Sequence, residues 1–220
     1  MRDELSRRVM LLFYNNFLSS REVLVDTKLN RYFLLIQKNG STSLVRLAID
    51  NPTRYKIVST SSLKGKEIDK ITVFVREPIG RYLSGISTQM SIYNMQEHSF
   101  NVMFNNDHIP MLDSHTMPQF WFLLAVVNEI DCNFDIQPLD MLYSVDPAIQ
   151  QLNKTTVNKM KLSDYIINRL NHFYTEDVVL FNQFLNKTIS LHQIKKKILL
   201  EKEFIDDITQ YKEYLTLYFN

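Results

Sequence analysis

The chain has 220 residues, 45% of them hydrophobic, and its 25 basic and 24 acidic residues leave a formal net charge of +1 at pH 7. This size and apolar share suit one globular domain with a sizeable core, whereas a charge near zero argues against a protein that binds nucleic acid through a broadly basic surface. The single cysteine, Cys132, excludes an intramolecular disulfide and a zinc site built from cysteines.

The longest uninterrupted apolar run, 120–127, is too short to cross a bilayer, so we expect no membrane span. The amino end lacks the apolar core and the cleavage site of a secretory signal. We therefore expect a protein that works in a cytoplasm, and the absence of a leader and a stem favours a bacterial or viral source.

Apolar residues at helical spacing over 4–18 predict an amphipathic helix. The run 32–36, YFLLI, predicts a strand that is buried on both faces, and a polar turn and a second helix, which Pro52 ends, follow it. The segments 55–58 and 71–75 also read as strands. Strands that alternate with helices indicate a parallel sheet, whose carboxyl edge collects the ligand.

The second half of the chain is predicted to be mainly helical. We expect helices over 118–129, 163–171 and 175–185, the last capped by Thr175, and helical spacing from residue 189 onward. The segments 134–136 and 141–142 are expected to be short extended pieces, and 90–113 and 150–161 are expected to be loops or broken helix.

The turn after the first buried strand carries the residues of an anion site. Lys38 and Gly40 lie in this turn, and the hydroxyl residues 41–43 open the helix that follows. The first N–H groups of a helix have no internal partner and carry about half a positive charge, so a phosphate binds well there. The alternative is an ordinary turn between a strand and a helix with a serine or threonine cap.

Two motifs together resemble the cofactor motifs of sulfotransferases that use 3′-phosphoadenosine 5′-phosphosulfate (PAPS). The segment 37–43, QKNGSTS, is similar to the family's PKxGTTS motif, which binds the 5′-phosphosulfate. The segment 76–86, REPIGRYLSGI, is similar to RDPxxRxxSxY, which holds the 3′-phosphate. The resemblance implies cofactor contacts by Lys38, Asn39, Gly40, Ser41, Thr42, Ser43, Arg76 and Ser84.

A narrower resemblance concerns the acceptor. The segments 114–119 (SHTMPQ), 152–155 (LNKT) and 173–181 (FYTEDVVLF) are similar to segments of carbohydrate sulfotransferases of the Golgi type. This resemblance implies that the acceptor is a sugar hydroxyl.

The general base is the least determined residue. Sulfotransferases use a histidine or glutamate near the acceptor, and His115 is our assignment, with His108 and His98 behind it and Asp50 as a weaker candidate. The alternative for His115 is a structural histidine before a helix.

The resemblance therefore implies one α/β domain over 1–220 with a P-loop-like three-layer fold and a central parallel sheet. An N-terminal helix and lead-in (1–30), a cofactor-binding core (31–150) and a helical C-terminal part (151–220) are expected. The expected reaction transfers a sulfuryl group from PAPS to a hydroxyl, releases adenosine 3′,5′-diphosphate and needs no metal. Lys38 and His115 are the expected catalytic residues, and no nucleic acid partner is expected.

Two rival functions stay open. A nucleotide-dependent phosphotransferase would need a hydroxyl that binds magnesium and an acidic partner at a strand end, and neither 32–36 nor 71–75 ends in aspartate. A nucleotide- or glycan-binding relative without activity would keep the same motifs but lack the base.

Overall fold

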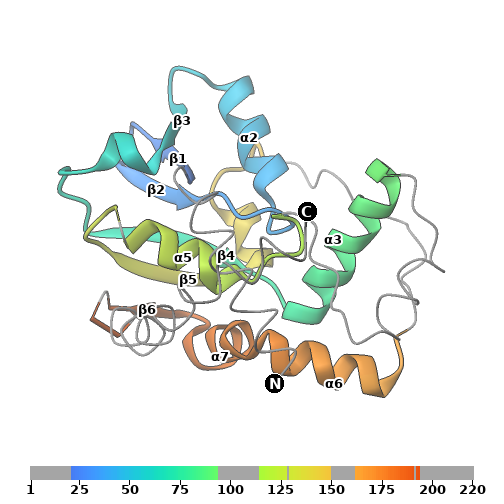
Figure 1. The fold of residues 1–220 in the computed structure, drawn as a ribbon. Helices are drawn as coiled ribbons and strands as arrows, with labels where there is room; N and C mark the ends of the chain where they lie inside the picture. The colour runs from blue at the N-terminus through green and yellow to red at the C-terminus, as the bar shows by residue number, and fades with distance from the viewer. Residues whose placement is uncertain (1–20, 94–113, 128, 150–161, 191, 194–220) are drawn as a thin grey trace, which may run out of the picture.

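The structure, a computed structural model, describes residues 21–93, 114–127, 129–149, 162–190 and 192–193 (Figure 1). The predicted N-terminal helix lies outside the described residues. Most of the predicted loop 90–113, including His98 and His108, also lies outside them. The same holds for the segment 152–155 and for the predicted helical spacing from 194 onward.

The described residues form an α/β fold around a six-stranded sheet of order β3-β1-β2-β4-β5-β6 (Figure 1). The strands are β1 (Glu22–Asp26), β2 (Arg31–Leu34), β3 (Tyr55–Ser59), β4 (Lys70–Val75), β5 (Asn133–Pro138) and β6 (Lys187–Ile189). The helices are α2 (Ser41–Asp50), α3 (Pro78–Tyr93), α5 (Gln119–Val127), α6 (Asp164–Phe173) and α7 (Thr175–Phe184), with short 3₁₀ helices η1 (Thr60–Leu63) and η2 (Leu139–Ser144).

The predicted parallel sheet is confirmed at its centre and wrong at its sides. β2, β4 and β5 are parallel, whereas β1 pairs antiparallel with both β2 and β3, and β6 pairs antiparallel with β5. The turn between β1 and β2 is too short for a crossover, so β1 can only fold back against β2. Asn30 adopts a positive φ of 49° in this turn, which asparagine tolerates better than most residues.

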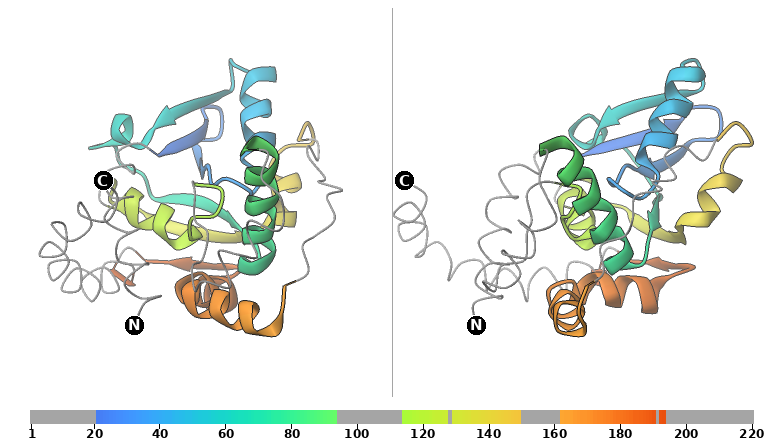
Figure 2. Two further views of the ribbon diagram at one scale, coloured as in Figure 1. Left: turned by 45° about the vertical axis from the view of Figure 1, so that its right-hand side comes forward. Right: turned by 90° about the vertical axis from the view of Figure 1, so that its right-hand side faces the viewer.

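Apolar side chains pack on both faces of the sheet. On one face, Ile71, Val73 and Phe134 join the core formed with α3, α5, α6 and α7. On the other face, Phe33 and Phe74 pack with α2 and η2. Figure 2 shows α6 and α7 beside β6, at the opposite end of the sheet from β3 and α2.

Two local predictions and one alternative, a serine or threonine cap on α2, need correction. The segment 141–142 is not extended but lies in η2, where Leu142 is buried against α2. The N-cap of α7 is Tyr174 rather than Thr175, because the Thr175 hydroxyl donates backward to the carbonyl of His172. No side chain caps α2, since Gly40 occupies its N-cap position.

A buried carboxylate joins the hairpin to β3. Asp26 is fully buried and accepts hydrogen bonds from Arg31 (2.9 Å) and from both Nε (3.2 Å) and Nη2 (2.9 Å) of Arg54. Burial raises the pKa of the Asp26 carboxyl, but the hydrogen bonds from Arg54 and Arg31 outweigh it and lower the pKa to about 2.

We expect this carboxylate to make the protein sensitive to acid. Because the folded pKa of Asp26 lies below its ordinary value, its stabilisation is complete above about pH 4 and is lost as the pH falls towards about 2. The shift corresponds to about 2 kcal/mol of unfolding free energy. Denaturant unfolding across this pH range should show a shallower loss for Asp26→Asn than for wild type, with exposed Asp131→Asn as control. Equal loss in wild type and Asp26→Asn would contradict this.

Candidate functional site

The two motifs meet at one edge of the sheet. β2 and β4 are parallel neighbours, with Phe33 opposite Thr72, so their carboxyl ends lie side by side. The segment 37–43, which we call the cradle, follows β2, and Arg76 follows β4 directly. The two motifs therefore lie at the carboxyl ends of neighbouring strands.

The cradle has the backbone geometry of an anion-binding turn. Lys38 and Gly40 adopt positive φ angles of 67° and 80°, and α2 begins at Ser41. No side chain caps α2 and no acidic residue lies in its first turn. The first N–H groups of α2 and the hydroxyls of Ser41 and Thr42 therefore suit an anion. Ser43 is buried.

Gln119 joins the cradle to the turn after β4. Its side chain is fully buried, and its Oε1 accepts from the Arg76 N–H (2.9 Å) and from Asn39 Nδ2 (2.5 Å). Its Nε2 donates to the Arg76 carbonyl (2.9 Å). One amide thus fixes the backbone of Arg76 on both sides and holds the cradle through Asn39.

Asn39 serves the scaffold of the cradle. Its side chain is 2% exposed and donates to the Phe74 carbonyl (2.8 Å) as well as to Gln119. Its backbone N–H donates to the carbonyl of Ile36 (3.1 Å). The N–H groups of Asn39 are therefore used inside the protein, although the motif resemblance placed this residue among the cofactor contacts.

A buried carboxylate in turn holds Gln119. Asp177 on α7 is fully buried and accepts from the backbone N–H groups of Gln119 and Phe120, both at 2.7 Å, and from Gln119 Nε2 at 3.3 Å. Asp177 thus caps the start of α5 from another helix. Burial raises the pKa of Asp177, and the positive charge of Arg81 opposes this shift. Three residues before Asp177, at the N-cap position of α7, the Tyr174 hydroxyl donates to the Thr116 carbonyl.

Arg81 fixes α3 between the cradle and the segment before α5. Its fully buried guanidinium donates to the carbonyl oxygens of Gln37 (3.2 Å), Ser114 (3.3 Å) and Met117. A Cβ atom on Gly85, one turn further along α3, would overlap the backbone of His115, so helix and segment are in direct contact. In Figure 1, α3 lies beside the chain that leaves β2.

Lys38 and Ser84 are brought to the same side of the sheet edge. Lys38 Nζ donates to the hydroxyl of Thr88 on α3 (2.7 Å). Arg81, Ser84 and Thr88 are spaced by three and four residues and therefore share one face of α3. Because Arg81 and Thr88 both contact the cradle, Ser84 lies on the face of α3 that is directed towards it.

Arg76 is a half-buried cation. Within the described residues its guanidinium makes no ion pair, because the neighbouring carboxylate of Glu77 accepts from the N–H groups of Ile79 (2.9 Å) and Gly80 (2.6 Å). Burial lowers the pKa of Arg76, and the charge of Glu77 partly offsets this. A half-buried guanidinium of this kind suits a phosphate dianion.

His115 lies next to α3, in the segment that Arg81 holds, and its side chain is partly buried. Asp50, the weaker candidate for the base, is the last residue of α2 and pairs with Arg46 (2.9 Å). At 1.5 Å per residue, Asp50 lies roughly 14 Å along the helix axis from Ser41 at the start of α2, so the geometry favours His115 over Asp50.

Comparisons of the chain with protein-family models, with curated proteins and with solved structures found no significant match. The described residues contain no group of three or more His, Cys, Asp or Glu that could hold a metal ion. None of the helices in the described part of the chain is both long and apolar enough to cross a membrane.

Substitution of Gly40 tests whether contact with η2 constrains the cradle. A Cβ atom at this position would overlap Leu142 of η2, and its φ of 80° disfavours any side chain. Gly65 has a similar φ of 77° but nothing within 4 Å of an added Cβ, so it is a matched control. We expect Gly65→Ala to cost about 1–2 kcal/mol of unfolding free energy, and Gly40→Ala about 1–3 kcal/mol more, in equilibrium denaturation. Equal losses would show that contact with η2 does not constrain the cradle.

Proposed function

We propose that the protein is a PAPS-dependent sulfotransferase with a P-loop-like three-layer fold. The observation that carries this proposal is the buried Gln119 amide, which binds Asn39 of the cradle and the backbone of Arg76 at once. Two anion-binding motifs held in fixed relation suit a ligand with two phosphate groups, as in PAPS.

The cradle would hold the phosphosulfate end of the donor. The hydroxyls of Ser41 and Thr42 and the first N–H groups of α2 bind its oxygens, and Lys38 neutralises the charge that develops on the bridging oxygen. Lys38 donates to the Thr88 hydroxyl, which itself donates to the Ser84 carbonyl (3.1 Å), and donor binding would exchange the first of these hydrogen bonds for one to the bridging oxygen. Arg76 and Ser84 hold the 3′-phosphate.

The reaction is an in-line displacement at sulfur. The acceptor hydroxyl oxygen forms the new bond to sulfur while the bond from sulfur to the phosphate oxygen breaks, which releases adenosine 3′,5′-diphosphate. His115 takes the acceptor proton, and Lys38 stabilises the leaving oxygen. The similarity of 114–119 and 173–181 to carbohydrate sulfotransferases favours a sugar hydroxyl as the acceptor.

Two alternatives have less support. A phosphotransferase would use an acidic residue at a strand end to hold magnesium, but Glu77, the acidic residue nearest the end of β4, caps α3 instead. A binding protein without activity would make the same contacts with the donor, but His115 would not act as a base in it.

Thermal unfolding with added nucleotides tests the donor. Adenosine 3′,5′-diphosphate at about 100 times its dissociation constant should add about 2.7 kcal/mol and raise Tm by about 5–10 °C. Lys38→Ala and Arg76→Ala should lose this shift, whereas Arg46→Ala on the exposed side of α2 should keep it. A shift with ATP and magnesium but none with adenosine 3′,5′-diphosphate would favour the phosphotransferase.

A further inference from the structure

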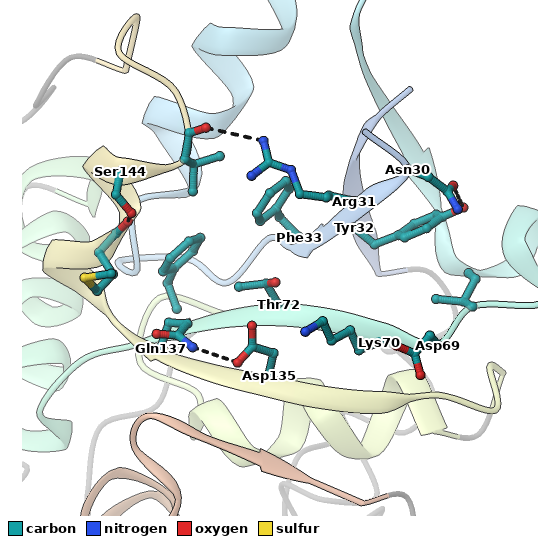
Figure 3. A pocket seen from close by; sticks show the side chains of 14 residues that line it. Asn30, Arg31, Tyr32, Phe33, Asp69, Lys70, Thr72, Asp135, Gln137 and Ser144 are labelled. Atoms are coloured by element: carbon teal, nitrogen blue, oxygen red, sulfur yellow. Dashed lines mark hydrogen bonds between the residues drawn. The ribbon is translucent and has the colours of Figure 1, made fainter. Parts of the chain in front are cut away.

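A second site lies on the face of the sheet that carries α2 and η2. A cavity of about 430 Å³ opens there over β2, β4 and β5 (Figure 3). This volume is within the range of small-ligand pockets, about 300–1,000 Å³. Neither the cradle nor Arg76 and Ser84 lines it.

The floor of the cavity is polar where a central sheet is usually apolar. On β4, Ile71, Val73 and Val75 are buried on the opposite face, while Lys70 and Thr72 are directed into the cavity. Figure 3 shows Lys70, Thr72 and Asp135 extending into the same space from neighbouring strands. Interior parallel strands normally carry apolar side chains on both faces, so this polar floor suggests a ligand.

A hydroxyl and a carboxylate of the floor lie in one row, beside the ring of Phe33, which is only 2% exposed. Phe33 lies opposite Thr72, and Thr72 lies opposite Asp135, on three adjacent parallel strands about 4.8 Å apart. The rings of Phe33 and Phe74 stack with centroids 6.1 Å apart and close the apolar end of the row.

Several hydrogen-bonding groups in this row are available to a ligand. In the part of the chain that the structure describes, the Thr72 hydroxyl and the Lys70 ammonium group make no hydrogen bond or ion pair. Asp135 accepts one hydrogen bond at Oδ1, from Gln137 Nε2 (2.7 Å), which leaves Oδ2. The site therefore offers both donors and acceptors within one row.

Charges of both signs line the cavity. Its cations are Lys70 and Arg31, which is already paired with Asp26 (2.9 Å), and its carboxylates are those of Asp69 and Asp135. A charged ligand of either sign would therefore meet like charges in the lining. A neutral ligand with several hydroxyls can donate to the carboxylates and accept from Lys70 and Thr72, which matches the row.

We propose that this cavity binds a neutral saccharide at a site separate from the cradle. η2 lies between the two sites, because Met141 and Ser144 line the cavity while Leu139 and Leu142 contact Gly40. This proposal goes beyond sulfuryl transfer and does not depend on it.

Saturation-transfer NMR with the methyl glycosides of glucose, galactose and N-acetylglucosamine and with their β-linked disaccharides tests the site. We expect saturation transfer to at least one of these sugars at millimolar concentration. Thr72→Val, which suits a strand and keeps the shape, and Asp135→Asn should each weaken binding about tenfold in titrations. Thr53→Val, in an exposed turn outside the cavity, should leave binding unchanged.

Other outcomes would overturn the proposal. These are no transfer to any sugar of the panel, binding that both cavity variants leave intact, or stronger transfer to glycine than to every sugar. Lys38→Ala separates the two proposals, because it should abolish the shift with adenosine 3′,5′-diphosphate and leave saccharide binding unchanged.

Discussion

Replacement of Gln119 by leucine should destabilise the protein and abolish its binding of adenosine 3′,5′-diphosphate. Leucine cannot replace the hydrogen bonds to the N–H and carbonyl groups of Arg76, so two backbone groups lose their partner. At about 1–3 kcal/mol for each unsatisfied buried group, we expect a loss of about 3–5 kcal/mol of unfolding free energy and about 10 °C in Tm.

The control for this variant is Gln183→Leu on the exposed side of α7. It should change the unfolding free energy by less than about 0.5 kcal/mol. If Gln119→Leu still binds adenosine 3′,5′-diphosphate with wild-type affinity at a temperature where it is folded, Gln119 does not hold the two motifs in register.

Replacement of Lys38 or His115 by alanine should give different patterns of lost activity. With PAPS and neutral glycans as substrates, Lys38→Ala should lower kcat by about 10²–10³-fold and weaken nucleotide binding, because Lys38 contacts the donor. His115→Ala should lower kcat by about 10²–10⁴-fold but keep the thermal shift with adenosine 3′,5′-diphosphate, because a base contacts only the acceptor.

The matched control for His115 is His172→Ala, an exposed histidine in the last turn of α6. It should transfer sulfate at the wild-type rate. Transfer by His115→Ala at the wild-type rate would refute its assignment as the base, and a loss in Asp50→Asn instead would move the base to α2.

Local patterns in the sequence were sufficient for the main elements. The apolar run before the cradle and the β-branched run before Arg76 predicted β2 and β4, and both are formed. Proline at 118 correctly marked the start of α5, and the helix expected over 163–171 is formed as α6, although Ser163 is its N-cap and not its first residue. These signals work because they depend on neighbouring residues.

The contacts that organise the site could not be predicted in this way. Gln119 binds Arg76 across 43 positions, and Asp177 caps α5 across 58. Hydrophobic periodicity carries no information about which polar side chain meets which backbone group. The only signals were the family resemblances of 76–86, 114–119 and 173–181, which did not assign Arg81, Gln119 or Asp177 to a role.

The polar floor of the cavity could not be predicted from the sequence either. In β5 the alternation of Asn133, Asp135 and Gln137 with buried Phe134 and Ile136 is the ordinary pattern of a strand with one face in water. Only the pairing of β5 with β4 and the position of η2 make Asp135 and Gln137 part of the lining of a cavity.

The most direct test of the central claim is calorimetric titration with adenosine 3′,5′-diphosphate and with 5′-AMP, which lacks the 3′-phosphate. Wild type should bind the diphosphate at least tenfold more tightly than 5′-AMP, a difference of about 1.4 kcal/mol or more. Arg76→Ala should bind the two ligands equally, and Lys38→Ala should weaken both. Equal affinity of the wild type for the two nucleotides, or no binding of either, would contradict a PAPS site at this edge of the sheet.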